Sequence, residues 1–337
     1  MKMTTLKSVA IAAGLASSAF GQATSPVVGY ETITLNAGIN PVGIRLLEKP
    51  VVTGQLETIG EAGVTDADVD FSTLLDPEVT YILEIEDAVG ILQIITQFSG
   101  GTLTTDEDLS GAVADGTSYT LREASTIASV FGADNSAGLT STTGADSSDQ
   151  ILVSNGIGGF DTYFFFDNGG TPALVLVDET SEFGIVPAVP EDIILPNDQG
   201  ILIVSPVANS LVVAGDLKTT PTSVPLSPGI NAVSSQFPVS QTIESVFGAD
   251  NSAGLTSTTG ADSSDQILVS DGNGGFDTYF FFDNEGTPAL VLVDETSAFG
   301  IVQATAADVE LGSGYLVVSP GSNNFTHSAP QIIVNAD

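Results

Sequence analysis

A long internal repeat constrains the fold of this chain more than any other feature. Residues 129–186 recur at 245–302, and the two copies differ at only four pairs of positions: Asn155/Asp271, Ile157/Asn273, Gly169/Glu285 and Glu182/Ala298. Weaker similarity relates 192–206 to 308–320 and 35–43 to 226–234. Such self-similarity predicts two units of the same fold. A recent duplication explains the near-identity without any selection on function.

The position of the repeats predicts how the chain divides. Both units open with an L-x-x-G-I-N-x-V segment, but about 75 residues interrupt the first unit after this segment. The predicted parts are a first β-module (24–47 plus 124–215), an inserted β-rich segment (48–123), a second β-module (216–327) and a C-terminal tail (328–337). Several domains also suit a chain of 337 residues, because a single core seldom covers so many.

Short strands separated by Gly, Asn, Asp and Pro dominate the local pattern and predict an all-β fold. We expect two homologous sandwich-like or barrel-like modules, a β-rich insertion in the first, and very little helix. The run at 163–166 carries aromatic residues on both faces and predicts a strand covered on both sides. Two short helices are expected, at 125–132 and 240–248. The expected strands are 30–35, 80–86, 91–98, 150–154, 160–167, 172–178 and 200–205.

The first 23 residues have the pattern of a secretory signal peptide. Lys2 and Lys7 give it a positive start, 8–19 form a short apolar stretch, and the small residues Gly21 and Ala23 permit cleavage. The apolar stretch is shorter than the roughly 20 residues that span a bilayer. We therefore expect a secreted protein, extracellular or on the cell surface, with the periplasm as an alternative.

The charge balance limits the partners that this protein can bind. Asp and Glu number 42 against six Lys and Arg, and the formal net charge is −36. Outside the predicted leader, the strong cations are Arg45, Lys49, Arg122 and Lys218. Because nucleic acids and anionic lipids attract basic surfaces, we expect neither nucleic acid nor an anionic membrane as a partner. Apolar residues make up 42% of the chain, which favours packed cores beneath an acidic surface.

The side chains needed for common catalytic mechanisms are scarce. The sequence has no Cys and a single His, His327, which we interpret as a solvated loop residue. Asp161 and Asp277 lie at equivalent positions in F-D-T-Y segments, where an aspartic protease would need Gly in place of Tyr. We therefore expect no enzyme. The alternative from another class is a carboxylate-dependent polysaccharide hydrolase, which would need two suitably spaced acids.

Calcium is the one cofactor that the sequence suggests. Acidic and amide side chains recur in Gly/Ser/Thr-rich loops, and Ca²⁺ takes such oxygens as ligands. The candidate ligands are Asp134, Asn135, Asp146 and Asp149 in the first module, Asp250, Asn251, Asp262 and Asp265 in the second, and Asp271, Asn273 and Asp277 in the segment DGNGGFD. Their spacing matches no established calcium loop. Hairpin turns explain the same residues without metal.

Three runs of sequence resemble a known family. They are DLSGAVADGTSYTLREASTIASVFG (108–132), SSDQILVSNGIGGFDTYFFFD (147–167) and DIILPNDQGILIVSP (192–206). Together with VGYETITLNAGINPVG (28–43), they are similar to a family of secreted verrucomicrobial-type bacterial paralogues of unknown function. The family carries Tyr more often at 164–166, and Asp, Trp or Tyr more often at 154 and 270. The resemblance implies a secreted, duplicated β-rich protein and carries over no site residue.

Taken together, these features predict a non-enzymatic extracellular protein that is structural, attached to the cell surface or ligand-binding. Its expected partners are a cell-envelope component, a glycan or further copies of itself. Self-assembly into fibres or layers is an alternative, because modular β-proteins expose strand edges that can pair. The strong like charge opposes assembly unless cations or salt screen it.

Overall fold

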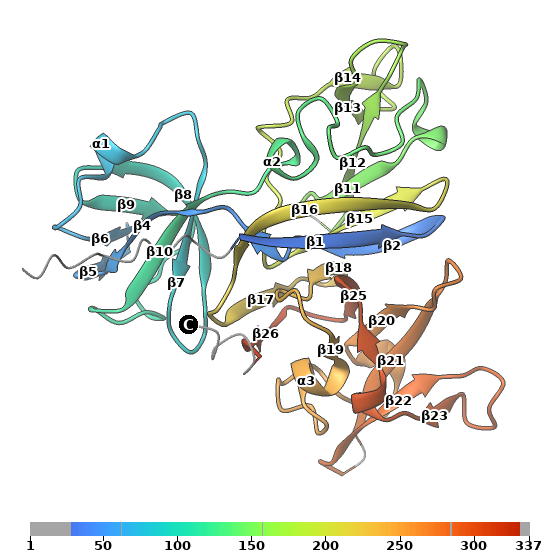
Figure 1. Cartoon of the computed structure of the whole chain (residues 1–337). Coiled ribbons are helices and arrows are strands. Elements are labelled where there is room, and N and C mark those ends of the chain that lie inside the picture. The colour runs from blue at the N-terminus through green and yellow to red at the C-terminus, as the bar shows by residue number, and fades with distance from the viewer. Residues whose placement is uncertain (1–27, 62, 157, 284, 331–337) are drawn as a thin grey trace, which may run out of the picture.

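The computed structural model describes residues 28–330, apart from residues 62, 157 and 284 (Figure 1). The predicted leader (1–23) and the last part of the predicted tail (331–337) lie outside the described residues. The fold is all-β, as predicted. Its described α-helices are α1 (Phe71–Leu74), α2 (Ile127–Phe131) and α3 (Ile243–Phe247), and its 3-10 turns are η1 (Ala145–Ser147), η2 (Ala261–Ser263) and η3 (Ala306–Asp308). No helix in the described part of the chain is long and apolar enough to cross a membrane.

The first module is a sandwich of a large and a small antiparallel sheet. The large sheet has the order β14 (Ile185–Pro187), β13 (Ala173–Val177), β12 (Phe160–Phe166), β11 (Gln150–Ser154), β15 (Gly200–Ser205) and β2 (Gly38–Gly43). The small sheet has the order β1 (Val28–Leu35), β16 (Asn209–Leu217) and β3 (Leu46–Leu47). Apolar side chains from the two sheets, such as Leu35, Ile151, Phe165 and Leu211, form a shared core that Phe131 of α2 completes.

The second module has the same strand order in its large sheet. Its large sheet runs β23 (Ile301–Gln303), β22 (Pro288–Val293), β21 (Phe276–Asp283), β20 (Gln266–Ser270), β25 (Gly314–Ser319) and β18 (Gly229–Ser234). Its small sheets are β17 (Thr222–Leu226) with β26 (Asn323–His327), and β19 (Gln241–Thr242) with β24 (Glu310–Leu311). Phe247, Phe281, Tyr315 and Phe325 lie in its core.

The inserted segment forms a seven-stranded sheet with a core of its own, at the left of Figure 1. The order is β4 (Pro50–Gln55), β10 (Ser118–Glu123), β7 (Tyr81–Ile85), β8 (Leu92–Ser99), β9 (Thr102–Thr105), β6 (Gly63–Thr65) and β5 (Thr58–Gly60). Phe71 from α1 packs against Tyr119, with ring centroids 6.5 Å apart. The apolar residues of the inserted segment therefore pack against one another in a separate core.

Local sequence explains the best-predicted elements. The strands expected from the sequence all form, with ends within two residues of the predicted ones. The side chains of Tyr163, Phe164 and Phe165 are all buried, which confirms a strand covered on both faces. Both predicted helices form and end before Gly132 and Gly248, and Thr126 and Thr242 cap their first turns.

The two large sheets contact each other reciprocally through small residues. A methyl group at Gly43 of β2 would lie 2.2 Å from the carbonyl oxygen of Ser313, next to Gly314 of β25. A methyl group at Gly200 of β15 would lie 3.0 Å from the backbone of Val233 in β18. Because 42–43 align with 233–234, and 200 with 314, the same surfaces meet twice, as across a two-fold axis. Leu202, Ala232 and Leu316 form a small apolar cluster at this contact.

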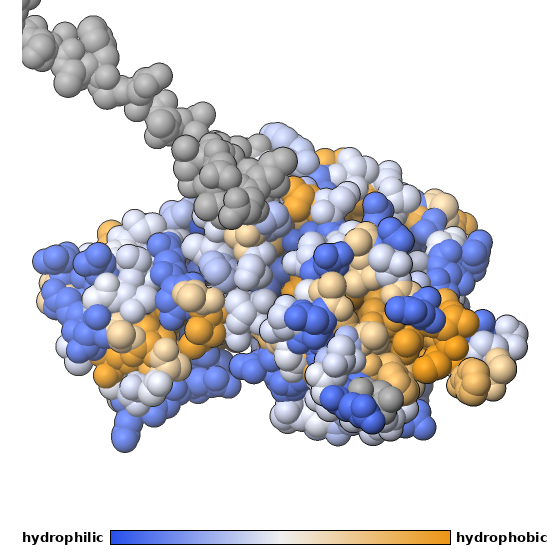
Figure 2. Space-filling view, turned by 90° about the horizontal axis from the view of Figure 1, so that it is seen from below, coloured by the Kyte–Doolittle hydropathy of each residue, from blue (hydrophilic) through white to orange (hydrophobic). Residues whose placement is uncertain are grey.

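The face seen in Figure 2 is mainly hydrophilic, with apolar patches over the inserted segment and the second module. Phe183 and Phe299, at equivalent positions of the repeat, are 82% and 90% exposed. Phe183 lies in the turn between β13 and β14, and Phe299 in the turn between β22 and β23, at one edge of each large sheet.

Candidate functional site

The few cations of this acidic protein lie at the contacts between its parts. Among the described residues, Lys49 is exposed, whereas Arg45, Arg122 and Lys218 are largely buried. Because burial of a charge is costly unless it is paired, each of these three side chains needs a partner inside the protein. We call the region around Arg122 and Lys218 the junction.

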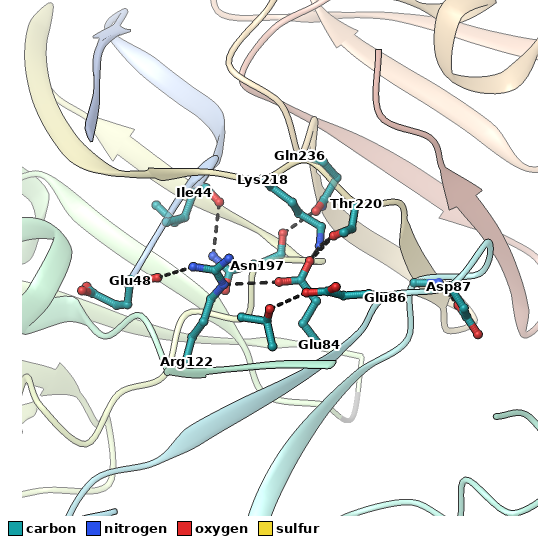
Figure 3. A network of polar contacts seen from close by, with 12 residues as sticks. Ile44, Glu48, Glu84, Glu86, Asp87, Arg122, Asn197, Lys218, Thr220 and Gln236 are labelled. Carbon is teal, nitrogen blue, oxygen red and sulfur yellow. Dashed lines mark hydrogen bonds and ion pairs between the residues drawn. The ribbon is translucent and has the colours of Figure 1, made fainter. Parts of the chain in front are cut away.

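Strand alternation brings Glu84 and Arg122 to the junction. Leu83 and Ile85 of β7 enter the core of the inserted segment, so Glu84 between them points to the opposite face. In β10, Leu121 enters that core and Arg122 points the same way as Glu84. The Arg122 Nε lies 3.3 Å from the Glu84 Oε2, and the Arg122 Nη1 donates to the Glu48 carbonyl oxygen at 2.9 Å (Figure 3).

Lys218 reaches the same carboxylate from the segment between the two modules. It follows β16, is 1% exposed, and donates to the Glu84 Oε1 and to the Thr220 hydroxyl at 2.8 Å (Figure 3). Burial alone would raise the pKa of Glu84, but the charge and hydrogen bond of Lys218 and the charge of Arg122 hold that pKa below its ordinary value. Glu84 is therefore an anion that binds two cations, and it ties the insert to the modules.

Arg45 ties the first module to the second. Its guanidinium pairs with Glu31 of β1, with the Nε 3.0 Å from one carboxylate oxygen. The Nη1 donates to the Phe237 carbonyl at 3.1 Å and to the Ser235 hydroxyl at 3.3 Å, both in the second module. Burial lowers the pKa of Arg45 to about 10, so the side chain is still charged at neutral pH. Each of the three buried cations thus joins segments that are far apart in sequence.

A cleft of about 380 Å³ opens beside the junction, where the insert meets both modules. Ile82, Leu92 and Ile94 on the outer face of β7 and β8 supply apolar lining, since Ile82 pairs with Ile94 in the sheet. Leu109, Pro196 and Pro225 add further apolar surface. Four acids line the cleft: Asp106, Glu107, Asp108 and Asp198.

Asp198 is the perturbed carboxyl of this cleft. Desolvation raises its pKa to about 6, although the backbone N–H groups of Asp198 and Gln199 oppose the shift. The half-buried residue lies in the turn before β15. Carboxyl groups with raised pKa values in clefts are concentrated at functional sites, which makes this cleft the candidate site of the chain.

The structure assigns hydrogen-bonding roles to four of the predicted calcium ligands. Asn135 has a positive φ of 63°, donates to the Leu139 carbonyl at 2.7 Å and accepts from the Leu139 N–H at 2.9 Å. The buried Asp149 accepts from the Thr140 N–H at 2.6 Å, from the Ser205 hydroxyl and from the Asn209 amide at 3.3 Å. Asn251 and Asp265 make the equivalent bonds in the second module. These side chains fix the loop that precedes β11 or β20.

The remaining predicted ligands lie at the surface. Asp134, Asp146, Asp250 and Asp262 are exposed. Asp271 accepts from the N–H groups of Asn273 at 2.7 Å and Gly275 at 2.9 Å, as in a hairpin turn, and Asp277 is exposed. Within 28–330, leaving aside residues 62, 157 and 284, no three His, Asp or Glu side chains are grouped to hold a metal ion. Calcium binding at these loops stays a prediction.

The interpretation of His327 as a solvated loop residue was wrong. It is the last residue of β26, fully buried, and packs edge-on against Phe237 with ring centroids 5.4 Å apart. Neither ring nitrogen has a hydrogen-bond partner in the described structure, and the paired Thr222 hydroxyl lacks one too. Burial lowers the pKa of His327 to about 3, so the ring is neutral at ordinary pH.

Sequence reasoning did not find Glu84, Asp198 or the junction. The one usable signal was the scarcity of Lys and Arg, because each cation of such an acidic chain is a candidate for a specific ion pair. Asp161 and Asp277, the acids that the sequence suggested for catalysis, are exposed on β12 and β21 and do not line the cleft. Comparisons with protein-family models, curated proteins and solved structures found no match.

Proposed function

We propose that this chain is a secreted, non-enzymatic extracellular protein, a structural or ligand-binding scaffold at the cell surface. The single observation that carries the proposal is the placement of the cations. Arg45, Arg122 and Lys218 are used to join the parts of the molecule, so Lys49 is the exposed Lys or Arg of the described surface. This arrangement supports a scaffold of fixed shape with an acidic exterior.

An acidic exterior suits work outside the cell. Like charges keep copies apart and soluble, and dissolved salt or cations reduce that repulsion. Contact with further copies, or with an anionic cell-envelope component or glycan, would therefore strengthen as salt screens the surface. The signal-peptide pattern of residues 1–23 supports the proposed location outside the cytoplasm.

The test is to express the full chain in a bacterial host and follow both its location and its activity. We expect a product outside the cytoplasm that lacks the leader, as measured by intact mass. We expect no release of reducing ends from a panel of soluble and insoluble polysaccharides. Retention of the leader in the cytoplasm would contradict the localisation, and turnover of any glycan would contradict the non-enzymatic function.

The second candidate function is the carboxylate-dependent polysaccharide hydrolase, and Asp198 is the observation that favours it. A carboxyl with a pKa of about 6 is protonated to a useful extent near neutral pH, as a general acid requires. Asp106 or Asp108 across the cleft would supply the second carboxylate. If turnover is found, Asp198→Asn should abolish it without changing secretion, and Asp277→Asn, which lies outside the cleft lining, should leave it unchanged.

A further inference from the structure

The cleft beside the junction combines an apolar lining with a negative rim. Leu92 and Ile94 are partly exposed and Ile82 lies just beneath the surface on the insert side, and Pro196 and Pro225 lie on the module side. A volume of about 380 Å³ falls within the range of sites for small organic molecules. The apolar lining can therefore accommodate the body of a small ligand.

The charges of the lining are all of one sign. Asp106, Glu107 and Asp108 are exposed at one side, and Asp198 lies at the other. None of the residues that line the cleft is a Lys, Arg or His. The nearby Lys218 and Arg122 are bound to Glu84 and do not neutralise these acids by direct contact. A cation in the cleft would stabilise the Asp198 carboxylate, which desolvation disfavours there.

Asn197 gives an independent sign that the cleft accepts a hydrogen-bond donor. The residue is 8% exposed and lines both the cleft and the small cavity beside Lys218. The amide nitrogen donates to the Ile44 carbonyl at 3.5 Å, but the side-chain oxygen accepts no hydrogen bond from the described residues. This oxygen is not among the buried side-chain atoms without a partner, so solvent reaches it, and an N–H group of a ligand would take the place of that water.

We propose that this cleft binds a small organic cation, an amine whose apolar body lies on Ile82, Leu92 and Ile94 and whose ammonium group lies near Asp198 and Asn197. The inference rests on the proposed function, because it gives the extracellular binding protein a class of ligand. The ammonium supplies both the positive charge that the four acids lack and the N–H donor that Asn197 lacks.

Isothermal titration of the full mature chain with three matched probes tests the inference. The probes are 4-phenylbutylamine, the neutral 4-phenylbutanol and the anionic 4-phenylbutyrate, at neutral pH and physiological salt. We expect the amine to bind at least about tenfold more tightly than the alcohol, because charge-assisted hydrogen bonds are stronger than neutral ones, and the carboxylate not to bind measurably. Equal binding of amine and alcohol would overturn the inference.

Variants separate the cleft from general attraction to an acidic protein. Asp198→Asn should weaken amine binding about tenfold or more, whereas Asp277→Asn, which removes the same charge outside the cleft, should change it less than about twofold. Equal losses in the two variants would overturn the proposed site. If Asp198→Asn fails to fold, Ala112→Phe, which fills the cleft from an exposed position, should abolish binding, and unchanged binding would contradict the proposal. Glycan turnover would contradict the non-enzymatic function without affecting these results.

Discussion

Lys218 donates to the carboxylate of Glu84 although 134 positions separate them in the sequence. The pair joins the segment between the two modules to β7, a central strand of the insert, and Arg122 binds the other oxygen of the same carboxylate. Removing one partner of a buried ion pair leaves the other charge without compensation in a poor solvent for ions.

Lys218→Met is therefore expected to lower the free energy of unfolding by about 3–5 kcal/mol, as measured by urea denaturation. Lys49→Met, which removes an exposed cation, should change it by less than about 0.5 kcal/mol. Arg122 still pairs with Glu84 in Lys218→Met, so adding Glu84→Leu should lower the free energy of unfolding further by taking this partner from the buried Arg122. Equal effects of the two Lys substitutions would contradict the structural role of Lys218.

His327 predicts a loss of stability in acid. Its folded pKa of about 3 lies below the ordinary 6.5, so between these values the unfolded chain binds a proton that the folded chain excludes. The free energy of unfolding should fall as the pH decreases through this window, by up to about 1.4 kcal/mol per pH unit from this residue. His327→Leu should flatten the profile relative to the wild type. A variant profile parallel to that of the wild type would show that folding does not lower the pKa of His327.

Asp198 predicts the opposite dependence. Its folded pKa of about 6 lies above the ordinary 3.8, so the folded chain binds the extra proton and gains stability as the pH falls from about 7 towards 4. Asp198→Asn should stabilise the protein at neutral pH and steepen the loss in acid, the reverse of the change caused by His327→Leu. Measurement of unfolding from pH 7 to 4 in both variants checks the two signs, and changes of the same sign would refute one assignment.

The loop carboxylates should behave as structural groups. Asp149→Ala removes a buried carboxylate that accepts three hydrogen bonds and should cost about 1.5–3 kcal/mol, whereas Asp146→Ala at the exposed position nearby should be nearly neutral. Melting temperatures in Ca²⁺, Mg²⁺ and chelator decide between the hydrogen-bonded turn and the predicted calcium site, and the turn interpretation requires the three temperatures to be equal. A site filled at 100 times its Kd would add about 2.7 kcal/mol, so a rise specific to Ca²⁺ would establish the predicted calcium site instead.

The two copies differ at one strained backbone position. Glu285 has a positive φ of 73°, where the first copy has Gly169 at 78°. Gly169→Glu should destabilise the protein by about 1–2 kcal/mol, because side chains disfavour this conformation. Glu285→Gly should stabilise it by less than about 1 kcal/mol, since the greater freedom of Gly in the unfolded chain offsets part of the gain. Thermal unfolding of the reciprocal pair measures both, and equal signs would contradict the strain.

Local features of the fold could be predicted from the sequence, and long-range ones could not. The strand at 160–166 and the helices before Gly132 and Gly248 depend on neighbouring residues, and the structure confirms them. His327 was misplaced because N-N-F-T-H has the composition of a loop, while pairing with β17 and packing on Phe237 bury it. The sequence suggests calcium at Asn135 and Asp149 because calcium ligands and turn-forming residues are the same residue types.

The candidate site could not be predicted either, because it too depends on contacts between distant parts of the chain. Glu84, Asn197, Asp198 and Lys218 come from different parts of the chain, and no spacing relates them. Strand alternation places Glu84 on the other face of the sheet from Leu83. Only the packing of the insert against the modules decides which residues contact the face that carries Glu84.

Buried cations join the insert and the two modules, so we expect the three parts to unfold together. Differential scanning calorimetry of the mature wild-type chain measures this through the ratio of calorimetric to van't Hoff enthalpy. We expect one cooperative transition with a ratio near one, which splits into separate transitions in Lys218→Met. Independent unfolding of the parts in the wild-type chain would contradict it.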